Sequence, residues 1–141
     1  MNNIDILIPT IIALAGILYS VHCFKSEMRI KLFADYTKRY QEIMLNLPPS
    51  TWTDDIDIND LPEGERSLAI KYYRAYFDLC SEEYFLWNNN QVDDRTWHEW
   101  RNGMQYAFSR KPVITAWRTI LVNSSYSTKF SKFVEELVVT A

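Results

Sequence analysis

The sequence predicts an all-α protein, in which an amino-terminal transmembrane helix continues into an antiparallel bundle of helices. Two observations lead to this prediction. Residues 6–24 form an apolar run that contains no Asp, Glu, Lys or Arg. Further along the chain, apolar residues recur at intervals of three and four, which is the period of an α-helix. No segment alternates with period two for long enough to require a sheet.

The apolar run fits a membrane span better than the two alternatives. A bilayer core of about 30 Å needs roughly 20 apolar residues in a helix, and the run just reaches this length. A soluble helix this apolar on every face needs a larger core than a chain of 141 residues usually builds. A signal peptide would begin with Lys or Arg and end at a small-x-small cleavage site, and neither flank fits. We therefore expect an uncleaved span in residues 1–24.

The charges on either side of this span predict its orientation. Asp5 precedes the run, whereas five basic residues follow it: Lys25, Arg29, Lys31, Lys38 and Arg39. Because basic residues stay on the cytoplasmic side, we expect the amino terminus outside and a cytosolic domain over residues 25–141. Membrane lipid is then one direct partner of the chain.

Breaker residues divide this cytosolic part. No Pro or Gly separates the span from the stripe of residues 32–47, so one helix is expected to continue to Pro48-Pro49. A loop rich in Pro, Asp and Asn follows. The next helix is expected from near Pro62, with Asp60 as its candidate cap, and it ends in the run NNNQ.

Two further breaks complete the bundle. Asp93 or Asp94 is expected to cap a third helix. Pro112 suits the first position of a fourth helix, and the run NSSYS forms the last turn before a closing helix. Together these segments predict an antiparallel cytosolic bundle on a single membrane anchor.

No residue pattern predicts a reaction, so we expect no enzymatic activity and no cofactor. His98 lies within a helical turn of Arg95 and Glu99 and could act as an acid-base group, but a histidine on a charged helix surface is the better explanation. The acidic run TDDIDIND resembles the start of a calcium loop. Counted from Asp55, however, the sixth position lacks Gly and the twelfth lacks Glu. We interpret it as a solvated acidic loop and predict no metal site.

Charge and cysteine content exclude further classes. The net charge of −3 argues against direct nucleic-acid binding, which normally requires a basic face. Cys23 and Cys80 form neither a disulfide framework nor a CxxC metal signature, and we expect both to be ordinary small apolar residues.

Two sets of residues are candidates for subunit contacts. Ala13, Gly16 and Ser20 are small residues spaced so that membrane helices can approach closely, which predicts a homo-oligomer. Ser20 and His22 are the polar groups expected near any lumen. The abundant aromatic residues are expected mainly in core packing. The alternative is a subunit interface, since aromatic residues are enriched there, and its candidates are Trp97, His98 and Trp100.

The segments FADYTKRYQEIMLNLP and YFDLCSEEYFLWNNNQVDDRTWHEWRNGM resemble an uncharacterised bacterial family of single-span, all-helical membrane proteins. A more distant similarity, in layout more than in motif, is to the membrane-pore accessory protein of type VI, RNA-targeting CRISPR systems. That protein has a divergent nuclease-like domain, marked by Arg and His with four to six residues between them. Here Arg95 and His98 have only two residues between them, so no catalytic residue is implied for this chain.

The resemblance implies a location in the bacterial inner membrane and a role in antiviral defence. The expected function is therefore a homo-oligomeric membrane protein that forms a pore or perturbs the membrane. The alternative is a membrane-anchored, non-enzymatic scaffold or accessory subunit that binds a different protein partner within a larger membrane complex.

Overall fold

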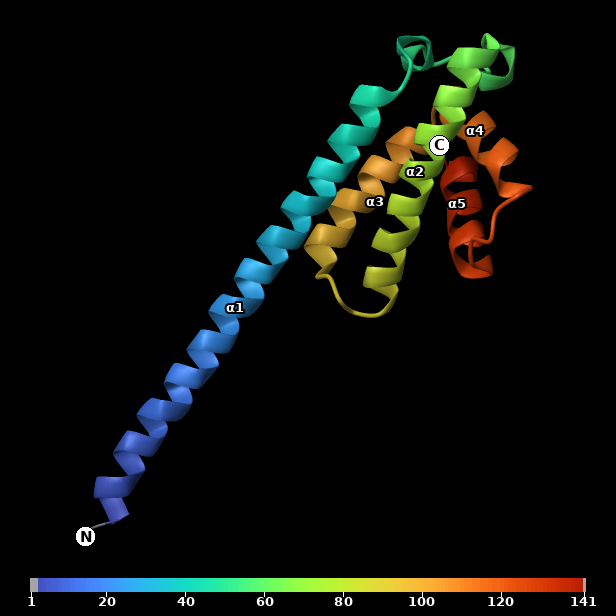
Figure 1. Ribbon diagram of the computed structural model, residues 1–141. Coiled ribbons are helices and arrows are strands. Elements are labelled where there is room, and N and C mark those ends of the chain that lie inside the picture. The colour runs from blue at the N-terminus through green and yellow to red at the C-terminus, as the bar shows by residue number, and fades with distance from the viewer. Residues whose placement is uncertain (1–2, 141) are drawn as a thin grey trace. The chain divides into compact units, whose positions relative to one another are not determined.

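The computed structural model describes residues 3–140, and this range is all-helical and contains no strand. The predicted fold class is therefore confirmed. Five α-helices, α1 to α5, follow one another along the chain, with two short 3-10 turns between α1 and α2 (Figure 1). The chain divides into two compact units, Met1–Asp35 and Tyr36–Ala141. Each unit is described by itself.

The first unit consists of the amino-terminal part of α1 (Asn3–Asn46). Within Leu7–Asn46, an 18-residue window has a mean hydropathy of 1.9, and none of it is buried in the structure. The core helix of a soluble protein would be mostly buried, which this window is not. By length and composition the helix could cross a membrane, and a signal sequence near an amino terminus meets the same criteria.

The second unit begins with the last turns of α1. Tyr36 and Leu47 are 8% and 5% exposed, so this end of the helix is packed against the bundle. The helix ends at Asn46 because the residue that precedes a proline avoids helical geometry, and Pro48 follows Leu47. The predicted stop at Pro48-Pro49 is confirmed.

The linker between α1 and α2 is more ordered than a solvated loop. It contains two 3-10 turns, η1 (Pro49–Trp52) and η2 (Ile58–Asp60). Ile58 is fully buried, and its amide donates a hydrogen bond of 3.3 Å to the hydroxyl of Thr115. The prediction that Asp60 caps the next helix is wrong, because Asp60 is the last residue of η2 and the N-cap of that helix is Pro62. Asp57 caps η2 by accepting from the amide of Asn59.

Two antiparallel helices follow, α2 (Glu63–Asn88) and α3 (Asp94–Phe108) (Figure 1). The N-cap of α2 is Pro62, which makes no side-chain cap hydrogen bond. Asn90 has a φ of 56°, so the turn after α2 uses the left-handed geometry that Asn tolerates. The side chain of Asp93 accepts from the amide of Thr96 at 2.9 Å, which confirms Asp93 as the cap of α3.

The last two helices close an aromatic core. They are α4 (Lys111–Leu121) and α5 (Thr128–Thr140). Pro112 lies in the first turn of α4, as its second residue and not the predicted first. Packing is most extensive between α2 and α4 and between α3 and α5. Trp117 of α4 is 1% exposed, and its ring meets those of Phe77, Phe108 and Phe130 nearly edge-on. Its indole N–H donates to Glu135 at 3.1 Å, so the buried nitrogen has a partner.

Candidate functional site: a groove beside the Arg39–Glu82 ion pair

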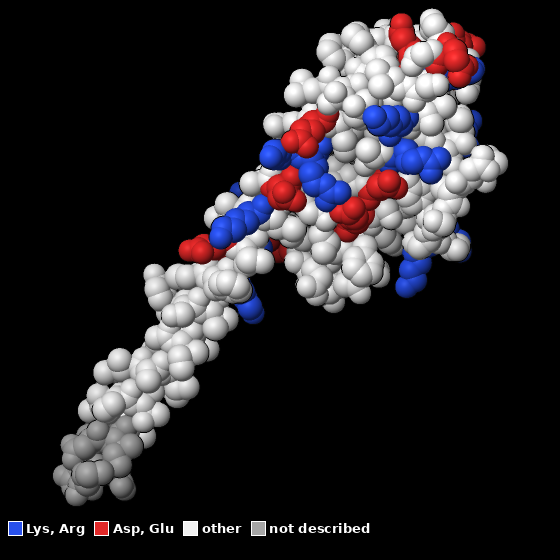
Figure 2. All heavy atoms as spheres, viewed as in Figure 1, with Lys and Arg blue, Asp and Glu red and all other residues white. Residues whose placement is uncertain are grey.

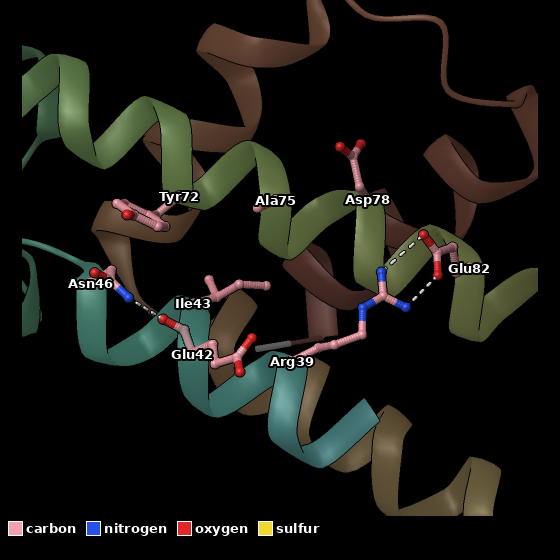
Figure 3. Close-up of a pocket in the computed structure, with 8 residues that line it drawn as sticks. All are labelled: Arg39, Glu42, Ile43, Asn46, Tyr72, Ala75, Asp78 and Glu82. Atoms are coloured by element: carbon pink, nitrogen blue, oxygen red, sulfur yellow. Dashed lines mark hydrogen bonds and ion pairs between the residues drawn. The ribbon is translucent and has the colours of Figure 1, made fainter. Parts of the chain in front are cut away.

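The second unit contains an open groove of about 550 Å³ between the last turns of α1 and the middle of α2 (Figure 3). Its lining combines three carboxylates, one guanidinium and a small apolar floor. The lining residues are Arg39, Glu42, Ile43 and Asn46 from α1, and Tyr72, Ala75, Asp78 and Glu82 from α2.

Helical spacing gives both walls of the groove. The four α1 residues are separated by three, one and three positions, and the four α2 residues by three, three and four positions. Residues three and four apart share one face of a helix, so each set forms a single stripe. Figure 3 shows α1 and α2 on two sides of the groove, with Arg39 reaching across to Glu82 and Asp78 pointing away from α1.

An ion pair connects the two walls. Arg39 donates two hydrogen bonds to the Glu82 carboxylate, of 2.7 Å from Nη1 and 3.1 Å from Nη2. The hydroxyl of Tyr36 donates to the same carboxylate at 3.2 Å. The hydrogen bond from Arg39 lowers the pKa of Glu82, whereas burial and then the Glu82 charge raise the pKa of Tyr36 to about 12. Both partners of the ion pair are therefore charged at neutral pH.

The next residue, Glu83, is in a very different environment. It is 7% exposed, and burial raises its pKa to about 8. Arg39 partly offsets this rise and Glu82 adds to it. Tyr76 and Cys80 are buried on the same face of α2. Burial raises the pKa of both groups, and the nearby Glu83 charge raises it further. The bundle therefore contains a carboxyl group that is largely protonated at neutral pH.

The rest of the groove is bordered by both acidic and basic side chains. Asp78 accepts a hydrogen bond of 2.7 Å from the hydroxyl of Tyr126, and Glu42 lies 3.9 Å from Lys38. Figure 2 shows acidic and basic side chains interspersed on the visible face of the second unit. Asp78 and Glu82 thus already accept hydrogen bonds within the chain, and Glu42 is the third carboxylate at the edge of the groove.

The described residues include no group of three or more His, Cys, Asp or Glu side chains placed to hold a metal ion. Cys23 is half-buried and Cys80 is fully buried, and both are free thiols. His98 is exposed and makes no hydrogen bond or ion pair with the described part of the chain.

The residues predicted to form helix contacts in the membrane all lie on α1. Ala13, Gly16, Ser20 and His22 are exposed. A Cβ atom added at Gly16 would have no heavy atom within 4 Å beyond its own helix and its chain neighbours. Ala13, Gly16 and Ser20 share one face, but Ser20 and His22 are two residues apart, or about 200° around the helix. They therefore point in nearly opposite directions.

The aromatic candidates on α3 contact other residues of the same chain. Trp97 is 7% exposed and stacks on Trp87 with the ring centres 4.6 Å apart. Trp100 is half-buried and stacks on Tyr36 at 5.0 Å. These contacts are those of core packing.

No family model matches the chain, and no curated protein and no solved structure matches it either.

Sequence reasoning did not identify the groove or its ion pair. Arg39 and Glu82 are 43 positions apart, so no local pattern connects them. The burial of Glu83, in contrast, could have been predicted from its spacing in the sequence. It continues the series Tyr73, Tyr76 and Cys80 at intervals of three and four, which places a carboxylate on the buried face of α2.

Proposed function

We propose that this chain is a homo-oligomeric, single-span membrane protein with no enzymatic activity of its own. The observation that carries the proposal is the exposed apolar part of α1, with its small residues Ala13, Gly16 and Ser20 on one open face. In lipid, apolar side chains gain nothing by leaving the bilayer, so close packing of small residues is what favours helix association. The basic residues Lys25, Arg29 and Lys31, which follow the apolar part of α1, support a cytoplasmic location of the bundle in this proposal.

A membrane pore is the more specific form of this proposal. One span cannot enclose a channel, so a pore requires several copies in a ring. If Ser20 packs in the helix contact, His22 on the other side of α1 is the polar group that faces the lumen. A role in antiviral defence depends on the family resemblance alone.

The groove favours a second candidate, a membrane-anchored scaffold. Its carboxylates and apolar floor are suited to a segment of another protein. In this alternative α1 serves only as an anchor, and the groove holds the partner.

The size of the purified protein distinguishes the two candidates. We expect native mass spectrometry of the full chain, released from detergent micelles, to show one defined copy number above two. Gly16→Leu should shift the population to monomers, because the added side chain separates the helices. Ala15→Leu is the matched control. It adds similar volume about 100° away around the helix, so it should leave the size unchanged.

The outcomes of this experiment are distinct. A monomer in the unmodified protein, or equal loss of assembly in both variants, contradicts association through the small-residue face. If the oligomer forms, ion flux through liposomes tests the pore. An oligomer that passes no ions leaves the scaffold as the function.

A further inference from the structure

A second, smaller cavity lies where the end of α1, the turn η1 and the α3–α4 junction meet, inside the second unit. Its volume is about 50 Å³, and its walls include Tyr73 and Tyr76, which are 2% and 3% exposed. Three aromatic residues at its rim are solvent-exposed: Trp52 at 60%, Tyr106 at 71% and Tyr40 at 44%. Clusters of exposed aromatic side chains are uncommon on soluble surfaces and are enriched at protein interfaces.

The rim is held in place before any partner arrives. The Arg110 guanidinium donates to the carbonyl oxygens of Thr51 and Trp52, at 3.2 and 2.8 Å, and to the Asp54 carboxylate at 2.6 Å. The backbone amide of Lys111 also donates to the Asp54 carbonyl. These bonds fix the segment that carries Trp52. A rim that is already ordered loses less entropy when it binds a partner.

The linker beside this cavity is strongly acidic. From Pro48 to Glu65 the sequence has six carboxylates and no Lys or Arg. Figure 2 shows acidic side chains gathered where Figure 1 places this linker. Two of the six carboxylates are paired, Asp54 with Arg110 and Glu63 with Arg66, and Lys111 is the other cation at the α3–α4 junction. Asp55 and Asp60 are exposed and belong to the same linker as Trp52, which lines the cavity together with the paired cation Arg110.

We propose that this cavity binds one aliphatic side chain from a basic segment of a different protein. A volume of about 50 Å³ accommodates the end of a leucine or valine side chain and is far below the 300 Å³ or more of a typical small-molecule site. The aromatic rim covers the stem of the bound side chain. Lysine or arginine residues on either side of it face the carboxylates of the linker. This interaction is independent of the proposed assembly through α1.

The test uses the full chain in nanodiscs of zwitterionic lipid, with empty nanodiscs as the blank. The probe is a dye-labelled pentapeptide with one leucine between four lysines, and binding is followed by fluorescence anisotropy. We expect it to bind about tenfold more tightly than two matched peptides, one with glutamate for lysine and one with serine for leucine. Raising the salt concentration should weaken its binding.

Variants locate the contact. Trp52→Ala and Tyr106→Ala should each weaken binding about tenfold, as expected for aromatic residues at the centre of an interface. Asp55→Asn should weaken it by a smaller factor of about two or three. Phe85→Ala is the control, because Phe85 is 64% exposed but does not line the cavity. Circular dichroism confirms that each variant is folded.

Three results would overturn the proposal. The first is equal binding of the three peptides. The second is unchanged affinity in both aromatic variants, provided that both are folded. The third is a smaller oligomer in Trp52→Ala without any peptide, since the cavity would then be occupied by a second copy of this chain.

Discussion

Arg39 and Glu82 join the last turns of α1 to α2 through two hydrogen bonds in the described structure, and both side chains remain partly exposed, at 38% and 48%. Glu83, the next residue, is buried and forms no ion pair with any residue that the structure describes. Two adjacent carboxylates therefore affect the bundle in opposite ways.

All five tryptophans lie at Trp52 or beyond, so tryptophan fluorescence reports the unfolding of the bundle alone.

We expect Arg39→Ala to lower the free energy of unfolding by about 1 kcal/mol, because a two-bond ion pair at a partly exposed site is worth about this much. Urea unfolding in detergent measures the change, and a double-mutant cycle with Glu82→Gln isolates the pair. Lys38→Ala is the control, since Lys38 and Glu42 are 74% and 63% exposed and 3.9 Å apart. An equal effect of both substitutions would contradict the assigned role of Arg39.

We expect Glu83→Gln to stabilise the bundle, and the gain to depend on pH. The pKa of Glu83 is about 8 in the folded chain against 4.5 in its ordinary state. Below the ordinary pKa the carboxyl is protonated in both states and costs nothing. As the pH rises from 4.5 to about 8, the Glu83 carboxyl ionises in the unfolded chain but stays protonated in the folded chain. The free energy of unfolding of the native protein therefore falls over this range. At pH 9 the variant should be more stable by about 2–4 kcal/mol.

Glu82→Gln supplies the opposite pH dependence as a control. The pKa of Glu82 is lowered in the folded chain, so its contribution is present above the ordinary pKa and disappears as the pH falls. The Glu82 variant should therefore be less stable than the unmodified protein at neutral pH and equal to it in acid. If the stability difference between Glu83→Gln and the unmodified protein does not change with pH, Glu83 is ionised in the native bundle at neutral pH.

We expect Trp117→Ala to destabilise the bundle by about 3–5 kcal/mol, the usual cost of removing a large buried aromatic residue. Trp117→Phe keeps a ring against Phe77 and Phe130 but leaves Glu135 without its donor, so the loss should be smaller, about 1–2 kcal/mol. Trp52→Phe, at a site 60% exposed, is the control and should change the unfolding midpoint little. A similar loss in all three variants would argue against Trp117 as the centre of the core.

The proposed topology predicts a labelling pattern in intact cells. Val122 is 81% exposed, so Val122→Cys offers a reactive thiol on the bundle. In a Cys23→Ser background, with Cys80 fully buried, an impermeant maleimide should label Val122→Cys only after the membrane is opened. Asn2→Cys, ahead of the apolar run, should be labelled from outside without opening. The reverse pattern would place the bundle outside.

The sequence predicted most of the helices because their ends depend on local chemistry. Pro48 ends α1, Asp93 caps α3 and Pro112 lies in the first turn of α4, and each effect acts within a few residues. The error at Asp60 has the same origin. Asp60 lies inside the turn η2, and Pro62 occupies the N-cap position of α2, so Asp60 is too far from the start of α2 to cap it.

The candidate site was less predictable because it forms between distant segments. The register of α1 against α2 decides that Arg39 meets Glu82, and helical periodicity gives the face of each helix but not its partner. The cavity beside Trp52 depends on Arg110, 58 positions away. Only Glu83 could have been identified from spacing alone, as a carboxylate within an apolar stripe.

The stack of Trp87 on Trp97 has an optical consequence. The two indole rings are nearly parallel, at 10°, with their centres 4.6 Å apart, and they belong to α2 and α3. At this separation their electronic transitions couple, and such coupling adds a pair of bands of opposite sign to the circular dichroism spectrum. Loss of that signal during unfolding would mark the moment at which α2 and α3 separate, independently of how much helix remains.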